Sequence, residues 1–144
     1  MKRPLRRVRA VRILALGALA ALILAACTPA GQAAGLAGTE WALTRLNGQA
    51  PLPGAALDLA FQADGKVAGS GGCNQSGGDY QTDGDKLSIT NLASTMRACA
   101  DPALNEQEAA YFAALAAVEQ FKLDGDHLSL LDAQGSAILE FARQ

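Results

Sequence analysis

The stretch from residue 57 to residue 69, LDLAFQADGKVAG, predicts the fold because it contains both halves of a β-hairpin. Residues 57–61 alternate between large apolar and small or polar side chains, as a strand with one buried face does. Residues 63–66, ADGK, are a turn sequence, and residues 67–69 return as a second strand. We therefore expect an antiparallel sheet built around this hairpin.

Upstream of the hairpin, residues 40–46 alternate in the same way and predict another strand. Trp41, Leu43 and Arg45 would share one face of it. The Asn47-Gly48 pair after this segment is a turn signal, and a proline-rich loop leads on to residue 57.

Downstream of the hairpin, a short pattern occurs twice. DGDKLSI at residues 83–89 and DGDHLSL at residues 124–130 each place an Asp-Gly turn before an alternating strand. Each copy is interpreted as the second half of a hairpin. The alternation in residues 137–141 predicts a last strand that could close the sheet.

One helix is expected between the two copies. Asp101-Pro102 provides an N-cap and a first-turn proline, and Glu106 and Glu108 would interact favourably with the helix dipole. The apolar face expected to pack on the sheet is formed by Leu104, Tyr111, Leu115 and Val118.

The glycine-rich stretch GSGGCNQSGGDY, residues 69–80, must be tested for catalytic or phosphate-binding motifs. Its glycine spacing fits neither a dinucleotide fingerprint nor a phosphate loop. Ser70 lies in an approximate nucleophile elbow and could pair with His127, but an elbow opens a helix on a parallel sheet. We interpret residues 69–78 as a structural bend, with Asn74 hydrogen-bonded to its own turn.

No cofactor or metal site is expected from the spacing of ligands. Cys73 and Cys99 lack zinc spacing, and the Asp-Gly-Asp turns lack the other ligands of a calcium loop. His127 precedes an inward-facing leucine and should face solvent. The sequence therefore predicts that the protein is not an enzyme.

The N-terminus has the pattern of a lipoprotein signal peptide. MKRPLRRVRAVR is basic, an uncharged apolar run follows, and Leu24-Ala25-Ala26-Cys27 resembles a lipobox. We expect residues 1–26 to be removed, Cys27 to be lipidated and residues 27–37 to form a flexible tether to a domain at 38–144. The protein would then be exported and lipid-anchored in the cell envelope, on the periplasmic face of the outer membrane if the cell has one.

Charge and length limit the possible partners. Residues 1–26 contain six of the twelve basic residues, which leaves six against fourteen acidic ones, a formal charge of about −8. An acidic body argues against binding to nucleic acid. The remaining length suits one domain with one core, and we expect a monomer whose contacts are the bilayer and an unknown envelope protein or small ligand.

Two segments resemble the META/HslJ domain family, also called DUF306. They are GGCN at residues 71–74 and STMRAC at residues 94–99, and they are preceded by GTEW at residues 38–41. The resemblance covers about residues 38 to 143. It implies a mainly β (α+β) fold, a small antiparallel β-barrel-like domain with one packed helix. Relatives are often envelope lipoproteins linked to heat response and novobiocin resistance, without an accepted catalytic set.

We expect the protein to be a non-enzymatic envelope protein that acts by binding or stabilising a partner. One alternative is a carrier that holds a small apolar ligand in the barrel mouth, and a weaker alternative is a serine hydrolase using Ser70. Substitution of Trp41 or Cys73 should impair folding, whereas Arg97 could form a buried ion pair or contact a partner.

The compartment bears on the two remaining cysteines. Thiols are oxidised outside the inner membrane, and Cys73 and Cys99 are the ones left once Cys27 is lipidated, so a disulfide between them is expected. Two buried free thiols are the alternative.

Overall fold

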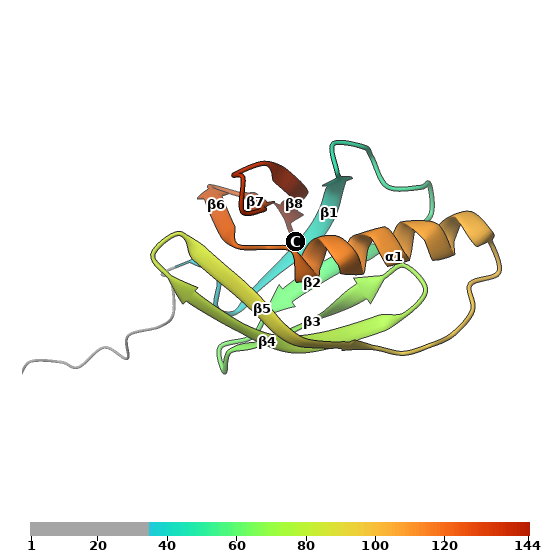
Figure 1. Ribbon diagram of the computed structural model, residues 1–144, viewed down its shortest axis with the longest axis horizontal. Coiled ribbons are helices and arrows are strands. Elements are labelled where there is room, and N and C mark those ends of the chain that lie inside the picture. The colour runs from blue at the N-terminus through green and yellow to red at the C-terminus, as the bar shows by residue number, and fades with distance from the viewer. Residues whose placement is uncertain (1–34) are drawn as a thin grey trace, which may run out of the picture.

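The computed structural model describes residues 35–144, which form eight strands and one helix (Figure 1). In chain order the elements are β1 (Thr39–Leu46), β2 (Leu57–Phe61), β3 (Lys66–Gly71), β4 (Gln75–Asp83), β5 (Lys86–Ser94), α1 (Pro102–Ala116), β6 (Gln120–Asp124), β7 (His127–Leu131) and β8 (Ala137–Arg143).

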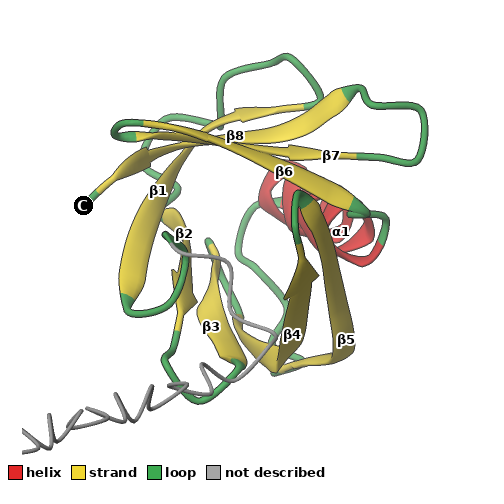
Figure 2. Cartoon of the chain, turned by 90° about the vertical axis from the view of Figure 1, so that its left-hand side faces the viewer, coloured by secondary structure: helices red, strands yellow, loops and turns green. Residues whose placement is uncertain are grey.

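The strands close into an antiparallel barrel whose strand order follows the sequence. Each strand pairs with the next along the chain, and β1 pairs with β8 to complete the ring. The ladder between β5 and β6 is short, with Lys86 opposite Gln120. The helix α1 connects these two strands and packs against β1, β3, β5 and β8 (Figure 2). The expected mainly β barrel with one packed helix is confirmed.

Large side chains from both halves of the chain fill the core. Trp41, Phe61, Tyr111, Leu128 and Phe141 are each at most 1% exposed. The Tyr111 hydroxyl donates a hydrogen bond to the Asp58 carbonyl oxygen at 2.9 Å. Burial raises the pKa of Tyr111, so the hydroxyl keeps its proton and remains a donor.

The alternation predicted for the first strand is interrupted. Trp41 and Leu43 face the core, but Arg45 is exposed and Leu46 is buried. The pairing of β1 with β8 shifts register between Leu43 and Arg45, and such a bulge reverses the facing of every later side chain. The prediction that Arg45 shares the face of Trp41 is therefore wrong.

The glycine-rich stretch is mostly strand. β3 continues to Gly71 and β4 begins at Gln75, so the bend is limited to residues 72–74 and the prediction of a bend over 69–78 is too wide. Gly72 has a φ of 104°, which favours glycine. Gly69 is needed for another reason, because a Cβ there would lie 2.2 Å from the Asp58 carbonyl oxygen of the neighbouring strand.

The two repeated hairpins and the helix start agree with expectation. Asp83 pairs with Lys86, and Asp124 pairs with His127, around tight Asp-Gly turns. Asp101 caps α1 by accepting a hydrogen bond from the Ala103 N–H at 2.9 Å.

Two parts of the helix prediction are wrong, the role of the two glutamates and the assignment of Val118 to the helix. The first turn of α1 contains no acidic residue, so Glu106 and Glu108 do not serve the helix dipole there. Val118 is buried but follows the end of α1 at Ala116.

The folded domain begins earlier than residue 38. Leu36 is fully buried in the core, and the Thr39 N–H donates a hydrogen bond to its carbonyl oxygen at 3.1 Å. Because the side chain of Leu36 is part of the core, the predicted tether over residues 27–37 extends too far at its C-terminal end.

Candidate functional site

Asn74 lies at the centre of a buried polar network beside the bend. Its side chain is 4% exposed, and its Nδ2 donates hydrogen bonds to the Arg97 carbonyl oxygen at 3.0 Å and to Glu108 Oε2 at 2.5 Å. Its Oδ1 accepts from Thr95 Oγ1 and from the Arg97 N–H, both at 2.8 Å. The expectation that Asn74 bonds its own turn is wrong, because its side chain instead holds a segment that follows β5.

Glu108 supports the same network from α1. The carboxylate is 6% exposed, and its Oε1 accepts hydrogen bonds from the Asn74 N–H at 2.6 Å and the Cys73 N–H at 3.2 Å. Gly71 makes room for it, since a Cβ at that position would lie 2.7 Å from Glu108 Cγ. One carboxylate therefore fixes both the main chain and the side chain of the bend.

The sequence interpretation did not identify this role of Glu108. A signal was present, because Glu108 falls four residues after Leu104 and three before Tyr111 on the face that packs on the barrel. An acidic residue at a core-facing helix position indicates a buried polar partner.

Cys73 and Cys99 come together in the same place. Their sulfur atoms lie within bonding distance and their Cα atoms are 5.8 Å apart, across a sequence separation of 26 residues. The two sulfur atoms and a carboxylate oxygen of Glu108 all lie within 4.8 Å of one another. The fold thus brings together a group of ligand atoms that local spacing did not suggest.

These contacts hold an exposed segment, residues 95–99, which we call the Met96 loop. Met96 is 97% exposed, although the residues on both sides of it are anchored. The Thr95 N–H donates a hydrogen bond to the Gln75 carbonyl oxygen at 2.9 Å. Arg97 is exposed, and its guanidinium donates to the Cys73 carbonyl oxygen at 3.0 Å, so the interpretation of Arg97 as half of a buried ion pair is wrong.

Trp41 is a core residue. It is fully buried, its Nε1 donates a hydrogen bond to Thr39 Oγ1 at 2.7 Å, and the Arg143 guanidinium carbon lies 4.4 Å from its ring centroid. These contacts support a structural role for Trp41, with a cation–π contribution from Arg143.

Ser70 and His127 lie on strands that are not neighbours. Ser70 is on β3, between β2 and β4, and its Oγ accepts a hydrogen bond from the Gly72 N–H at 3.1 Å. His127 is exposed at the start of β7, between β6 and β8, so the expectation that it faces solvent is confirmed.

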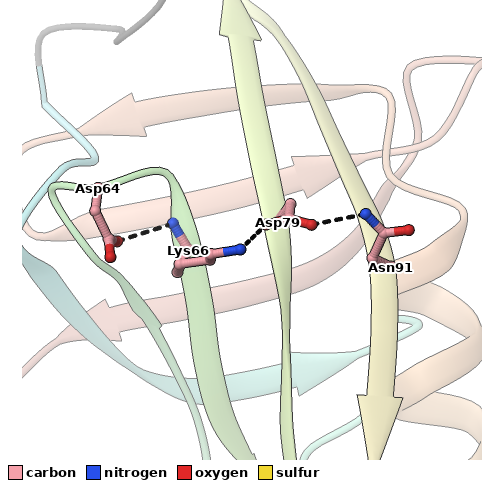
Figure 3. Close-up of polar contacts among 4 residues, drawn as sticks. All are labelled: Asp64, Lys66, Asp79 and Asn91. Atoms are coloured by element: carbon pink, nitrogen blue, oxygen red, sulfur yellow. Dashed lines mark hydrogen bonds and ion pairs between the residues drawn. The ribbon is translucent and has the colours of Figure 1, made fainter.

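A second polar cluster lies on the outer surface of β3, β4 and β5 (Figure 3). Lys66 forms an ion pair with Asp79, and Asn91 Nδ2 donates to Asp79 Oδ2 at 2.7 Å. The hydrogen bond from Lys66 lowers the pKa of Asp79, and the same bond raises the pKa of Lys66. An exposed pair of this kind contributes little to stability, so this cluster joins strands rather than forming a reactive site.

The proposed lipidation site, Cys27, lies outside the described residues. Within residues 35–144, no helix has both the length and the apolar character needed to cross a membrane.

Comparison with known families gives one match over most of the chain. The META domain model matches residues 34–144, which include every element of the fold and the network around Asn74. Curated proteins give no match to this chain.

Solved structures give the same fold. An NMR structure of a protein from Burkholderia xenovorans is 28% identical, with a TM-score of 0.60 over 76% of this chain and 83% of the other. A second NMR structure is 25% identical, with a TM-score of 0.61 over 74% and 90% of the two chains. A DUF4847 family protein from Bacteroides vulgatus shares the fold at 20% identity, with a TM-score of 0.50 over 74% and 93%.

Proposed function

Since this chain belongs to the META domain family, we propose that it is an exported, lipid-anchored envelope protein that acts by binding a protein partner through the Met96 loop. The observation that carries the proposal is the exposure of Met96. A methionine that is 97% exposed on a held loop has no packing role in the monomer, and the flexible, polarizable thioether of methionine is common at adaptable binding surfaces.

The loop is prepared for binding because its conformation is already fixed. Asn74 Oδ1 accepts hydrogen bonds on both sides of Met96, from the Thr95 hydroxyl and from the Arg97 main-chain N–H. A partner would therefore bear little of the entropy cost of ordering the loop. The flexible thioether of Met96 suits an apolar pocket, and Arg97 adds a cation beside it.

The two alternative functions have less support. A carrier needs an internal space, whereas Trp41, Phe61 and Tyr111 fill the interior and are at most 1% exposed. The hollow of about 450 Å³ between the β1–β2 loop and α1 lies on the surface rather than inside the barrel, and polar residues such as Gln107 line it together with apolar ones. A serine hydrolase would need a base within reach of Ser70, whereas His127 is on a strand that is not adjacent to β3.

The lipid anchor is tested by Cys27→Ala. We expect this variant to remain unprocessed or to appear in the soluble fraction, because durable anchoring depends on acyl chains at the cysteine. The measurement is cell fractionation combined with mass spectrometry of the N-terminal peptide. A wild-type protein that is soluble and unmodified at residue 27 would contradict the anchor.

The contact function is tested in a deletion strain complemented with single variants at matched protein levels. Met96→Asp and Arg97→Ala should lower survival under heat or novobiocin, since both residues are exposed and truncation of a central contact residue costs about 2 kcal/mol or more of binding free energy, which is more than tenfold in affinity. Gln134→Ala, at an exposed turn, is the matched control and should behave as the wild type.

Two further variants separate contact from catalysis. Ser70→Ala and His127→Ala should both leave survival unchanged. Full survival of the Met96→Asp strain would contradict the contact function. Loss of survival with both Ser70→Ala and His127→Ala, while folded protein stays abundant, would favour a hydrolase.

A further inference from the structure

The place where α1 meets the bend holds three potential metal ligands. The sulfur atoms of Cys73 and Cys99 and a carboxylate oxygen of Glu108 lie within 4.8 Å of one another. The cysteines come from the β3–β4 bend and the Met96 loop, whereas Glu108 comes from the helix. Three rigidly held elements thus converge on one point, which is the arrangement that a metal site needs.

The carboxylate of Glu108 is buried and faces the cysteine pair. Glu108 is 6% exposed and accepts three hydrogen bonds from N–H groups, and neither salt bridge in the described part of the chain involves it. Its Oε2 lies 3.9 Å from Cys99 Sγ, so the negative charge faces the cysteine pair. Buried charges are normally paired with a cation or coordinate a metal.

We propose that the reduced form of this protein binds one Zn²⁺ ion through Cys73, Cys99 and Glu108, with water as the fourth ligand. Zn²⁺ accepts thiolate sulfur at about 2.3 Å and carboxylate oxygen at about 2.0–2.2 Å in a tetrahedron. Those bond lengths place ligand atoms roughly 3.5–3.8 Å apart. The distance of 3.9 Å between Cys99 Sγ and Glu108 Oε2 is already close to that spacing, whereas the two sulfur atoms lie within bonding distance and must separate to bind the ion.

The chemistry balances with an external dithiol as the reductant. The dithiol gives two electrons and two protons to the Cys73–Cys99 bond, which becomes two thiols, and is itself oxidised to a disulfide. Zn²⁺ then displaces both thiol protons and binds the two thiolates. Both cysteines are half-buried, so the sulfur atoms are accessible to a small reductant. In this way the metal would replace the covalent bond that holds the Met96 loop.

The test uses the full chain in detergent with Cys27→Ser in every sample, so that the remaining thiols are those of Cys73 and Cys99. We expect the oxidised protein to have no free thiol and to bind no Co²⁺. After reduction with a phosphine, it should bind one Co²⁺ with thiolate-to-metal charge-transfer bands and tetrahedral visible bands, and Zn²⁺ should displace it. Cys73→Ser should remove the charge-transfer signal or reduce it by about half.

Two helix variants test the third ligand. Glu108→Gln should weaken Zn²⁺ binding at least about tenfold. Glu106→Gln, exposed on the same helix, should bind as the wild type. If Glu108→Gln does not fold, X-ray absorption of the Zn²⁺-loaded reduced wild type decides, with two sulfur and two oxygen ligands expected.

Three results would contradict the proposed zinc site. They are the absence of charge-transfer bands in reduced protein that circular dichroism shows to be folded, equal Zn²⁺ affinity in a folded Glu108→Gln variant, and a four-sulfur zinc shell formed between chains. None of these results affects the proposed contact function, which is measured by survival of Met96 and Arg97 variants.

Discussion

Glu108→Ala is expected to lower the free energy of unfolding by about 3–5 kcal/mol, because it leaves several buried donors without an acceptor. The carboxylate accepts hydrogen bonds from the Cys73 N–H, the Asn74 N–H and Asn74 Nδ2. Each buried donor left unpaired costs about 1–3 kcal/mol, and partial access of water to the bend reduces the sum. Urea unfolding followed by circular dichroism measures the change.

Glu106→Ala is the matched control for this prediction. Glu106 lies on the same helix and is exposed, so its removal should change the free energy of unfolding by less than about 0.5 kcal/mol. Amide hydrogen exchange gives a second measurement. Loss of Glu108 should increase the exchange rates of the Asn74 and Arg97 amides more than those of the barrel strands. A loss below about 1 kcal/mol in Glu108→Ala would show that the network does not depend on its carboxylate.

Trp41→Ala is the second change with a large expected effect, a loss of about 3–5 kcal/mol in the free energy of unfolding. The side chain is fully buried on β1, and its removal would leave a cavity beside both neighbouring strands, β2 and β8. The substitution would also remove the hydrogen bond from Trp41 to Thr39 and the contact of its ring with Arg143. Because Trp41 is the single tryptophan, unfolding must be followed by circular dichroism rather than fluorescence.

Two comparisons test the physical reason for the loss. Trp41→Phe should cost less than Trp41→Ala, since it retains an aromatic ring in the core. Met96→Ala, at a site that is 97% exposed, should leave stability within about 0.5 kcal/mol of the wild type. Equal stability of Trp41→Ala and Met96→Ala would mean that the barrel core does not depend on Trp41.

The strands and turns were predictable because their signals are local. Alternation in residues 57–61 and the Asp-Gly turns at Gly84 and Gly125 gave hairpins that the structure confirms. The N-cap at Asp101 is equally local, since its side chain binds an N–H two residues away. Arg45 was misplaced because a bulge depends on the partner strand β8, which is almost a hundred residues away in the chain.

The candidate site was predicted only in part. Asn74, Cys73 and Arg97 were recognised as informative through a family resemblance, but the partner of Asn74 was assigned to the wrong segment. Met96 was not singled out, because a methionine next to Arg97 gives no local sign of its exposure. Glu108 lies close enough to the start of the helix to suggest a dipole role, and only its spacing of three residues from buried Tyr111 indicates that it faces the barrel.

The sequence by itself determined the hairpins and the start of the helix, since each depends on residues within a few positions of one another. Only the tertiary structure decided the register in which β1 meets β8, the place of the Cys73–Cys99 pair beside α1 and the inward turn of Glu108 to Asn74. Those contacts join residues 26 to about 100 positions apart, and they form because closing the barrel buries the shared core. Burial then requires each enclosed polar group to find a partner, wherever in the chain that partner lies.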